Sequence, residues 1–107
     1  MANITVVHTS MGSELDANKL AEALIEKRLA ACVQINGPGV SVYSWQGEIE
    51  KANEWYLTIK TPAHFAKTLL LWLEKHHPYE IPEISWSTCV CSLAYGEWAA
   101  DAVDVRK

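Results

Sequence analysis

The chain has 107 residues, half of them hydrophobic, and a formal net charge of −4 at pH 7. This length predicts one domain over residues 1–107, and its five Trp indicate aromatic surface that is buried between subunits. The negative charge and the lack of a basic cluster argue against a nucleic-acid partner. With no secretory leader, no apolar run long enough for a bilayer and an odd number of Cys, we expect a cytoplasmic protein with no membrane partner.

A short strand and an amphipathic helix are predicted first. Residues 4–8 are rich in β-branched side chains and predict a strand that ends at His8. Ser13 is the expected N-cap of a helix that ends near Arg28, with Asp16 as its capping-box partner. The apolar residues of this helix recur at helical spacing, at Ala17, Leu20, Ala21 and Leu24.

A long hairpin is predicted next. One strand starts at 32–35, is kinked or bulged at 37–39, and continues over 40–45 with period-two character. Residues 46–47, Gln-Gly, suit a two-residue turn, after which the chain returns through 55–60. On the returning strand, alternate side chains share a face: Trp55, Leu57 and Ile59 on one side, and Tyr56, Thr58 and Lys60 on the other.

A second helix, a last strand and a terminal helix complete the predicted order. Residues 61–62, Thr-Pro, suggest an N-cap followed by Pro at the first helical position, and Pro78 ends that helix and moves His77 out of the α region. Residues 84–91 predict the last strand, and 95–102 a short helix. The order β-α-β-β-α-β predicts an α+β, ferredoxin-like fold with one antiparallel sheet and two helices on one face.

Four blocks of sequence, in order and at compatible spacing, carry a family resemblance. They are Leu29-Ala30-Ala31-Cys32-Val33, Tyr43-Ser44-Trp45-Gln46-Gly47-Glu48-Ile49, Lys60-Thr61 and His77-Pro78-Tyr79-Glu80-Ile81-Pro82-Glu83-Ile84. Together they resemble the CutA family of divalent-cation tolerance proteins. The resemblance implies a tight homotrimer in which the long hairpin pairs with neighbouring subunits. It also implies a link to copper and other divalent metals, with no catalytic reaction securely attached.

The histidines next to Pro78 carry the main functional hypothesis. In copper-binding members a soft residue closes the first strand and two adjacent His precede Pro-Tyr; here these positions hold His8, His76 and His77. The resemblance therefore implies a metal site of these three imidazoles, for Cu²⁺ and other divalent cations, because imidazole suits Cu(II). The structural alternative has equal weight: His76 packs at the helix end, and His77 bonds a backbone carbonyl.

The three cysteines are interpreted separately from the histidines. Cys32 is expected in the core, since free Cys is among the most buried residues. Cys89 and Cys91 share one face of a strand and are a weak signal for a soft metal.

A second constellation would form if Tyr79, Glu80, Lys60 and Trp45 converge. At a subunit boundary these groups would bind a small anion or do acid–base work, but we favour an inter-subunit salt bridge with aromatic packing. No Ser–His–Asp arrangement, P-loop or GxGxxG is present, so we expect no enzyme. Two functions follow: a trimeric metal-binding or signalling protein with an unknown protein partner, and a small enzyme or effector-binding module that uses clefts between subunits.

Overall fold

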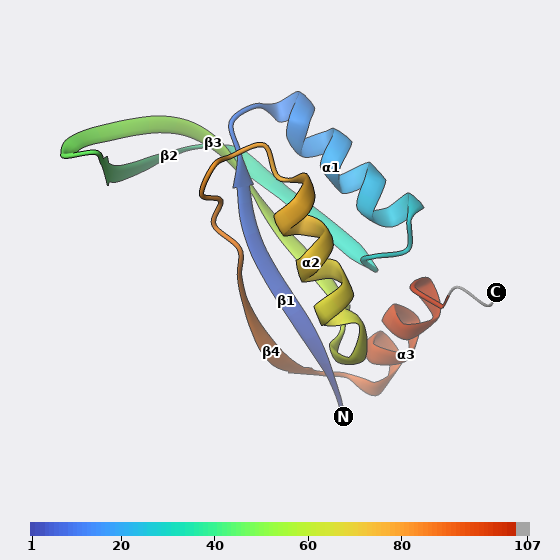
Figure 1. Cartoon of the computed structure of the whole chain (residues 1–107). Helices are drawn as coiled ribbons and strands as arrows, with labels where there is room; N and C mark the ends of the chain where they lie inside the picture. The colour runs from blue at the N-terminus through green and yellow to red at the C-terminus, as the bar shows by residue number, and fades with distance from the viewer. Residues whose placement is uncertain (105–107) are drawn as a thin grey trace.

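The computed structural model describes residues 1–104 as one open sheet with two helices on one face and the C-terminal helix against the other (Figure 1). The elements are β1 (Ala2–Met11), α1 (Glu14–Glu26), β2 (Cys32–Trp45), β3 (Glu48–Pro62), a 3-10 turn (Ala63–Phe65), α2 (Ala66–His76), β4 (Ser85–Cys91) and α3 (Leu93–Ala102). The strands pair antiparallel in the order β2-β3-β1-β4, and α1 and α2 cover the same face. The predicted α+β, ferredoxin-like fold is confirmed.

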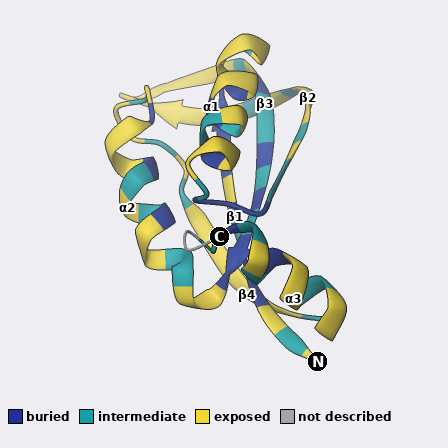
Figure 2. Ribbon diagram, turned by 90° about the vertical axis from the view of Figure 1, so that its right-hand side faces the viewer, coloured by how far each residue is buried: buried dark blue, intermediate teal, exposed yellow. Residues whose placement is uncertain are grey.

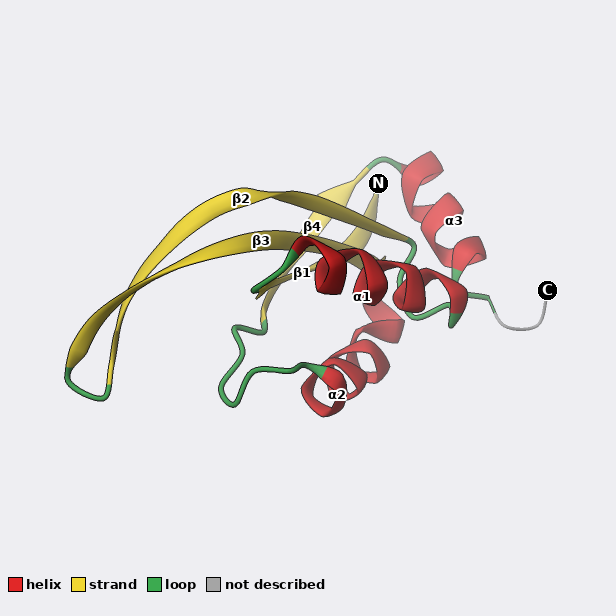
Figure 3. Ribbon diagram, turned by 90° about the horizontal axis from the view of Figure 1, so that it is seen from above, coloured by secondary structure: helices red, strands yellow, loops and turns green. Residues whose placement is uncertain are grey.

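The β2–β3 hairpin projects well beyond the rest of the sheet and makes the molecule 47 Å long (Figure 3). Its register shifts between Asn36 and Gly39, so the predicted bulge is confirmed. At the tip Gln46 has φ 50° and Gly47 has φ 84°, the paired positive values of a tight hairpin turn. β3 starts at Glu48, directly after this turn, and is therefore longer than the predicted strand 55–60.

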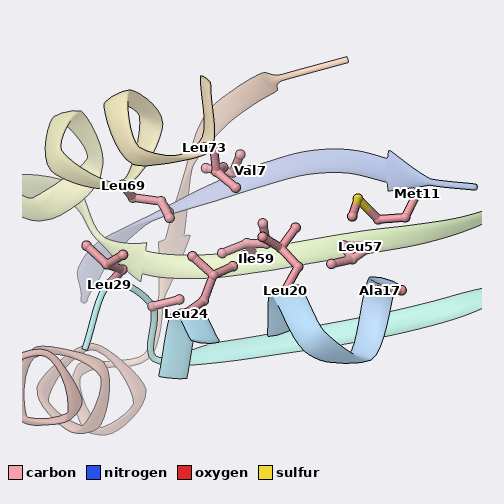
Figure 4. Packing of buried hydrophobic residues seen from close by; sticks show 11 residues of the cluster. Val7, Met11, Ala17, Leu20, Leu24, Leu29, Leu57, Ile59, Leu69 and Leu73 are labelled. Atoms are coloured by element: carbon pink, nitrogen blue, oxygen red, sulfur yellow. The ribbon is translucent and has the colours of Figure 1, made fainter. Parts of the chain in front are cut away.

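The core lies between the sheet and the two covering helices (Figure 4). Leu57 and Ile59 of β3, predicted to share a face, both point into it and are almost fully buried. Both helices contribute stripes that face the sheet (Figure 2). The cluster comprises Val7, Met11, Ala17, Leu20, Leu24, Leu29, Ala30, Leu57, Ile59, Leu69 and Leu73. Burial of one such Leu or Ile stabilises the fold by about 1.5–3 kcal/mol.

α3 builds a second, smaller cluster at the end of the sheet opposite the hairpin tip (Figure 1). Ile4 of β1 and Ala99 of α3 are buried there, with Tyr95 and Cys91 packed against them. The helix begins at Leu93, two residues before the predicted start, because the Ser92 hydroxyl accepts a hydrogen bond from the Tyr95 N–H at 3.2 Å.

Ser13 caps α1 as predicted, and its hydroxyl accepts a hydrogen bond from the Asp16 N–H at 3.0 Å. The prediction that Thr61 and Pro62 start the second helix is wrong. Thr61 is fully buried and pairs with Thr5 in the sheet, and its hydroxyl donates to the Leu29 carbonyl at 3.1 Å. Pro62 is the last residue of β3, a position that tolerates a missing N–H. The same Thr-Pro pair suits a strand end and a helix start, so tertiary pairing decides between them.

Candidate functional site

An open cleft of about 510 Å³ lies along the hairpin, from Glu54 to Trp45 beside the tip turn. Its wall combines the end of β1, both hairpin strands and the segment that follows α2. The lining residues are Ser10, Ser41, Tyr43, Trp45, Ala52, Glu54, Tyr79, Glu80, Ile81 and Glu83. The volume falls within the range of small-molecule sites in proteins.

Glu54 is the most buried carboxylate of the cleft, with 7% of its surface exposed. The Ser10 hydroxyl donates to Oε2 of Glu54 at 2.8 Å, and the Tyr79 hydroxyl donates to the same oxygen at 2.9 Å. Burial alone would raise the pKa of Glu54, but hydrogen bonds from Ser41, Ser10 and Tyr79 outweigh it and leave the pKa lowered. Glu54 is therefore an anion at neutral pH.

Tyr79 is held as a hydrogen-bond donor. Burial and the neighbouring Glu54 carboxylate raise the pKa of Tyr79 to about 12, so its hydroxyl stays protonated. Gly12 leaves room for this ring, since a Cβ at that position would lie 3.2 Å from the Tyr79 hydroxyl oxygen.

His77 connects the end of α2 to β1. Its Nε2 donates to the Ser10 carbonyl at 2.8 Å, and its Nδ1 accepts the Tyr79 N–H at 3.1 Å. Only the neutral ring with hydrogen on Nε2 satisfies both bonds, and burial lowers the pKa of His77 in agreement. The interpretation that His77 bonds a backbone carbonyl is confirmed, and both of its ring nitrogens are occupied.

His76 and His8 lie elsewhere and are exposed. The His76 ring stacks on Trp72 with centroids 4.1 Å apart, and its Nδ1 donates to the Trp72 carbonyl at 2.9 Å. His8 was expected at a strand end, but β1 continues to Met11, so His8 lies within the strand, opposite Thr58 and Ser85. Within residues 1–104, no three His, Cys, Asp or Glu side chains are grouped to hold a metal ion. The His8, His76 and His77 site stays a prediction.

The second predicted constellation is assembled in part. Trp45, Tyr79 and Glu80 line the cleft, whereas Lys60 lies with its Nζ 6.0 Å from the Tyr95 ring centroid. Sequence reasoning missed Glu54 and Ser10. Their partnership joins residues 44 apart in sequence, and the Tyr79–Glu54 bond joins residues 25 apart, so no local pattern marks it.

The cysteines are free thiols: Cys89 is exposed, and Cys32 and Cys91 are half-buried. Cys32 is therefore less buried than the core position expected for it. In the described part of the chain, none of the helices has the length and apolar character needed to cross a membrane.

Comparisons with known proteins agree on one family. A family model for the CutA1 divalent ion tolerance protein matches residues 5–102. The divalent-cation tolerance protein CutA of Thermus thermophilus is 43% identical over 79 residues, which cover 74% of this chain and 77% of that protein. The CutA homolog of Danio rerio is 37% identical over 85% of this chain, which spans only 61% of that relative.

Solved structures extend this similarity to the whole fold. CutA from Synechococcus elongatus PCC7942 has a TM-score of 0.91 and 35% identity, with 97% of this chain and 93% of that chain covered. The structure of that protein complexed with a Bis-Tris molecule has a TM-score of 0.85 and 34% identity, with 95% of each chain covered.

Proposed function

Because the chain belongs to the CutA1 family of divalent ion tolerance proteins, we propose that it is a cytoplasmic homotrimer that binds Cu²⁺ and other divalent cations. The family is one of tolerance proteins and not of enzymes. Its cellular role would be a response to metal, passed on to a protein partner.

The projecting hairpin is the observation that supports a trimer. Its outer part exposes apolar side chains, among them Val40 at 61%, Val42 at 60% and Ile49 at 79%. β2 and β4 are the outer strands of an open sheet, and Trp86 and Val90 on β4 are also exposed. Edge strands with apolar side chains normally need cover from another chain. A neighbouring copy would supply that cover for both edges.

His76 is the best-prepared imidazole for the proposed metal site. Because its Nδ1 donates to the Trp72 carbonyl, the lone pair of the neutral ring is on Nε2. Metal-binding histidines are commonly oriented through such a bond on the other nitrogen. His77 would have to release its bond to the Ser10 carbonyl before it binds a metal. We propose that a neighbouring subunit brings His8, His76 and His77 together, since one chain does not group them.

Isothermal titration with Cu²⁺ tests this proposal. The trimer should bind Cu²⁺ saturably at pH 7.5, and His76→Ala should weaken binding without unfolding the protein, because this side chain is exposed. His64→Ala is a matched control, since His64 is also exposed, on the 3-10 turn and outside the proposed site. Full affinity in the double variant His76→Ala/His77→Ala would reject the site.

The cleft supports a second function, binding of a small-molecule effector. It is large enough for such a ligand, and its Glu54 carboxylate is held in place by the hydroxyls of Ser10 and Tyr79 and by Ser41. A relative of the same fold was solved in complex with Bis-Tris, a small hydroxylated amine. A metabolite panel scored by melting temperature tests this function, because a ligand that binds only the native protein raises that temperature.

A further inference from the structure

We infer that the cleft binds small hydroxylated ammonium ions in preference to neutral or anionic molecules of the same size. This inference rests on the proposed effector function and specifies the chemistry of its ligand. The cleft contains three carboxylates, Glu54, Glu80 and Glu83. Among residues 1–104, no Lys, Arg or His is part of its lining. From the side chains of this chain, an anionic ligand would therefore meet like charges and no cation.

The direction of the hydrogen bonds gives an independent reason. The hydroxyl groups of Ser10 and Tyr79 both donate their hydrogen to Oε2 of Glu54. What these two hydroxyls can still offer a ligand is their oxygen lone pairs. Ser41 also contributes a hydrogen bond to the Glu54 carboxylate, whose negative charge faces the cleft together with those of Glu80 and Glu83. The inner wall is thus rich in acceptors, so a ligand that donates N–H or O–H hydrogen bonds fits it best.

Aromatic side chains complete the match to a cation. Tyr43 and Trp45 of β2 line the same cleft and are partly accessible, with 45% and 37% of their surfaces exposed. Aromatic faces attract ammonium groups, an interaction that contributes about 0.5–2 kcal/mol. In contrast, no three acidic or imidazole groups of the described residues converge on one point, which favours an organic cation with spread-out charge over a metal ion.

Three ligands of similar length but different charge test whether the cleft selects its ligand by charge. Diethanolammonium, diethylene glycol and diglycolate have similar lengths, and they are cationic, neutral and anionic at neutral pH. Titration calorimetry in phosphate buffer at constant ionic strength should show saturable binding of diethanolammonium. Diethylene glycol should bind about tenfold more weakly, which corresponds to the loss of one charge interaction, and diglycolate should not bind.

Two variants test which carboxylates of the cleft cause the preference for cations. Glu54→Gln keeps the acceptor oxygen for Ser10 and Tyr79 but removes the charge, and should weaken diethanolammonium binding about tenfold. The double variant Glu80→Gln/Glu83→Gln changes only exposed side chains, so it remains informative if Glu54→Gln does not fold. Glu22→Gln on α1 is the control and should bind as the unmodified chain does.

The outcomes also separate this inference from the effector function. Equal binding of the neutral probe, stronger binding of the anionic probe, or unchanged affinity in both glutamine variants would overturn the preference for cations while a small-molecule site remained. Absence of binding by all three probes would overturn the inference too, and the metabolite panel would then decide the effector function on its own.

Discussion

The β2–β3 hairpin has two regions that differ in what stabilises them. At its base, Leu57 and Ile59 are 1% and 0% exposed and pack against α1, α2 and β1. At its tip, Val42 is 60% and Ile49 is 79% exposed. Both regions follow the same strand periodicity, but only the base packs into the hydrophobic core of its own chain. Within one chain, the tip is therefore stabilised mainly by hydrogen bonding between β2 and β3, whereas the base is also stabilised by side-chain packing in the core.

The largest expected effect concerns the tip. If a neighbouring subunit covers it, Ile49→Asp places a charge in an apolar interface and should dissociate the assembly. Light scattering should give three times the 12.0 kDa chain mass for the unmodified protein and one chain mass for the variant. A matched exposed change away from the hairpin, Leu15→Asp on α1, should stay trimeric. A monomeric unmodified protein at micromolar concentration would contradict the trimer itself.

The base should respond in the opposite way. Leu57→Ala removes a fully packed side chain and should lower the free energy of unfolding by about 2–5 kcal/mol. Denaturant titration measures this loss. Val42 makes no comparable core contact within the single chain. If Leu57→Ala lowered the free energy of unfolding less than Val42→Ala in the dissociated protein, the contrast between base and tip would be wrong.

The sequence predicted the base well and the tip only in outline. Alternation at Leu57 and Ile59, the Ser13 cap and the Gln46-Gly47 turn are local signals, and each of them is confirmed. The Thr61-Pro62 start of a helix was wrong because burial of Thr61 against β1 overrides the local signature.

The candidate site was predicted only in part for a related reason. Its lining was indicated by Trp45, Tyr79 and Glu80, which belong to the blocks with family resemblance. Glu54 was missed because a carboxylate on a strand normally faces water, and its burial depends on side chains brought by β1 and by the segment after α2.

Glycine substitutions at the junction between base and tip should have smaller effects on stability, and they test the same contrast. A Cβ at Gly39 would lie 2.4 Å from the Tyr56 ring, and Tyr56 shares a hydrogen bond of 3.0 Å with Ser41 of the cleft. Gly39→Ala should therefore displace this ring and lower stability by about 1–3 kcal/mol. Gly47→Ala is the comparison at the tip: it meets no neighbouring atom and should cost only about 1–2 kcal/mol of backbone strain at φ 84°. Thermal unfolding, together with the tyrosine absorbance, would distinguish the two.

The smallest expected effect is a two-step loss of stability in acid. Burial lowers the pKa of His77 below 6.5, so the unfolded chain binds the proton more readily than the native one. Stability is then complete above pH 6.5 and decreases as the pH falls below it. The pKa of Glu54 is lowered below 4.5, so its contribution is present above pH 4.5 and is lost at more acidic pH.

Two conservative variants assign these steps to their residues. His77→Gln can keep a donor for the Ser10 carbonyl and an acceptor for the Tyr79 N–H, and it should remove only the step just below pH 6.5. Glu54→Gln should remove only the step below pH 4.5. Denaturation midpoints measured from pH 8 to pH 3 report both. If the first step persisted in His77→Gln, another group would have to cause it, and burial of the neutral His77 ring would not be the source of the acid sensitivity.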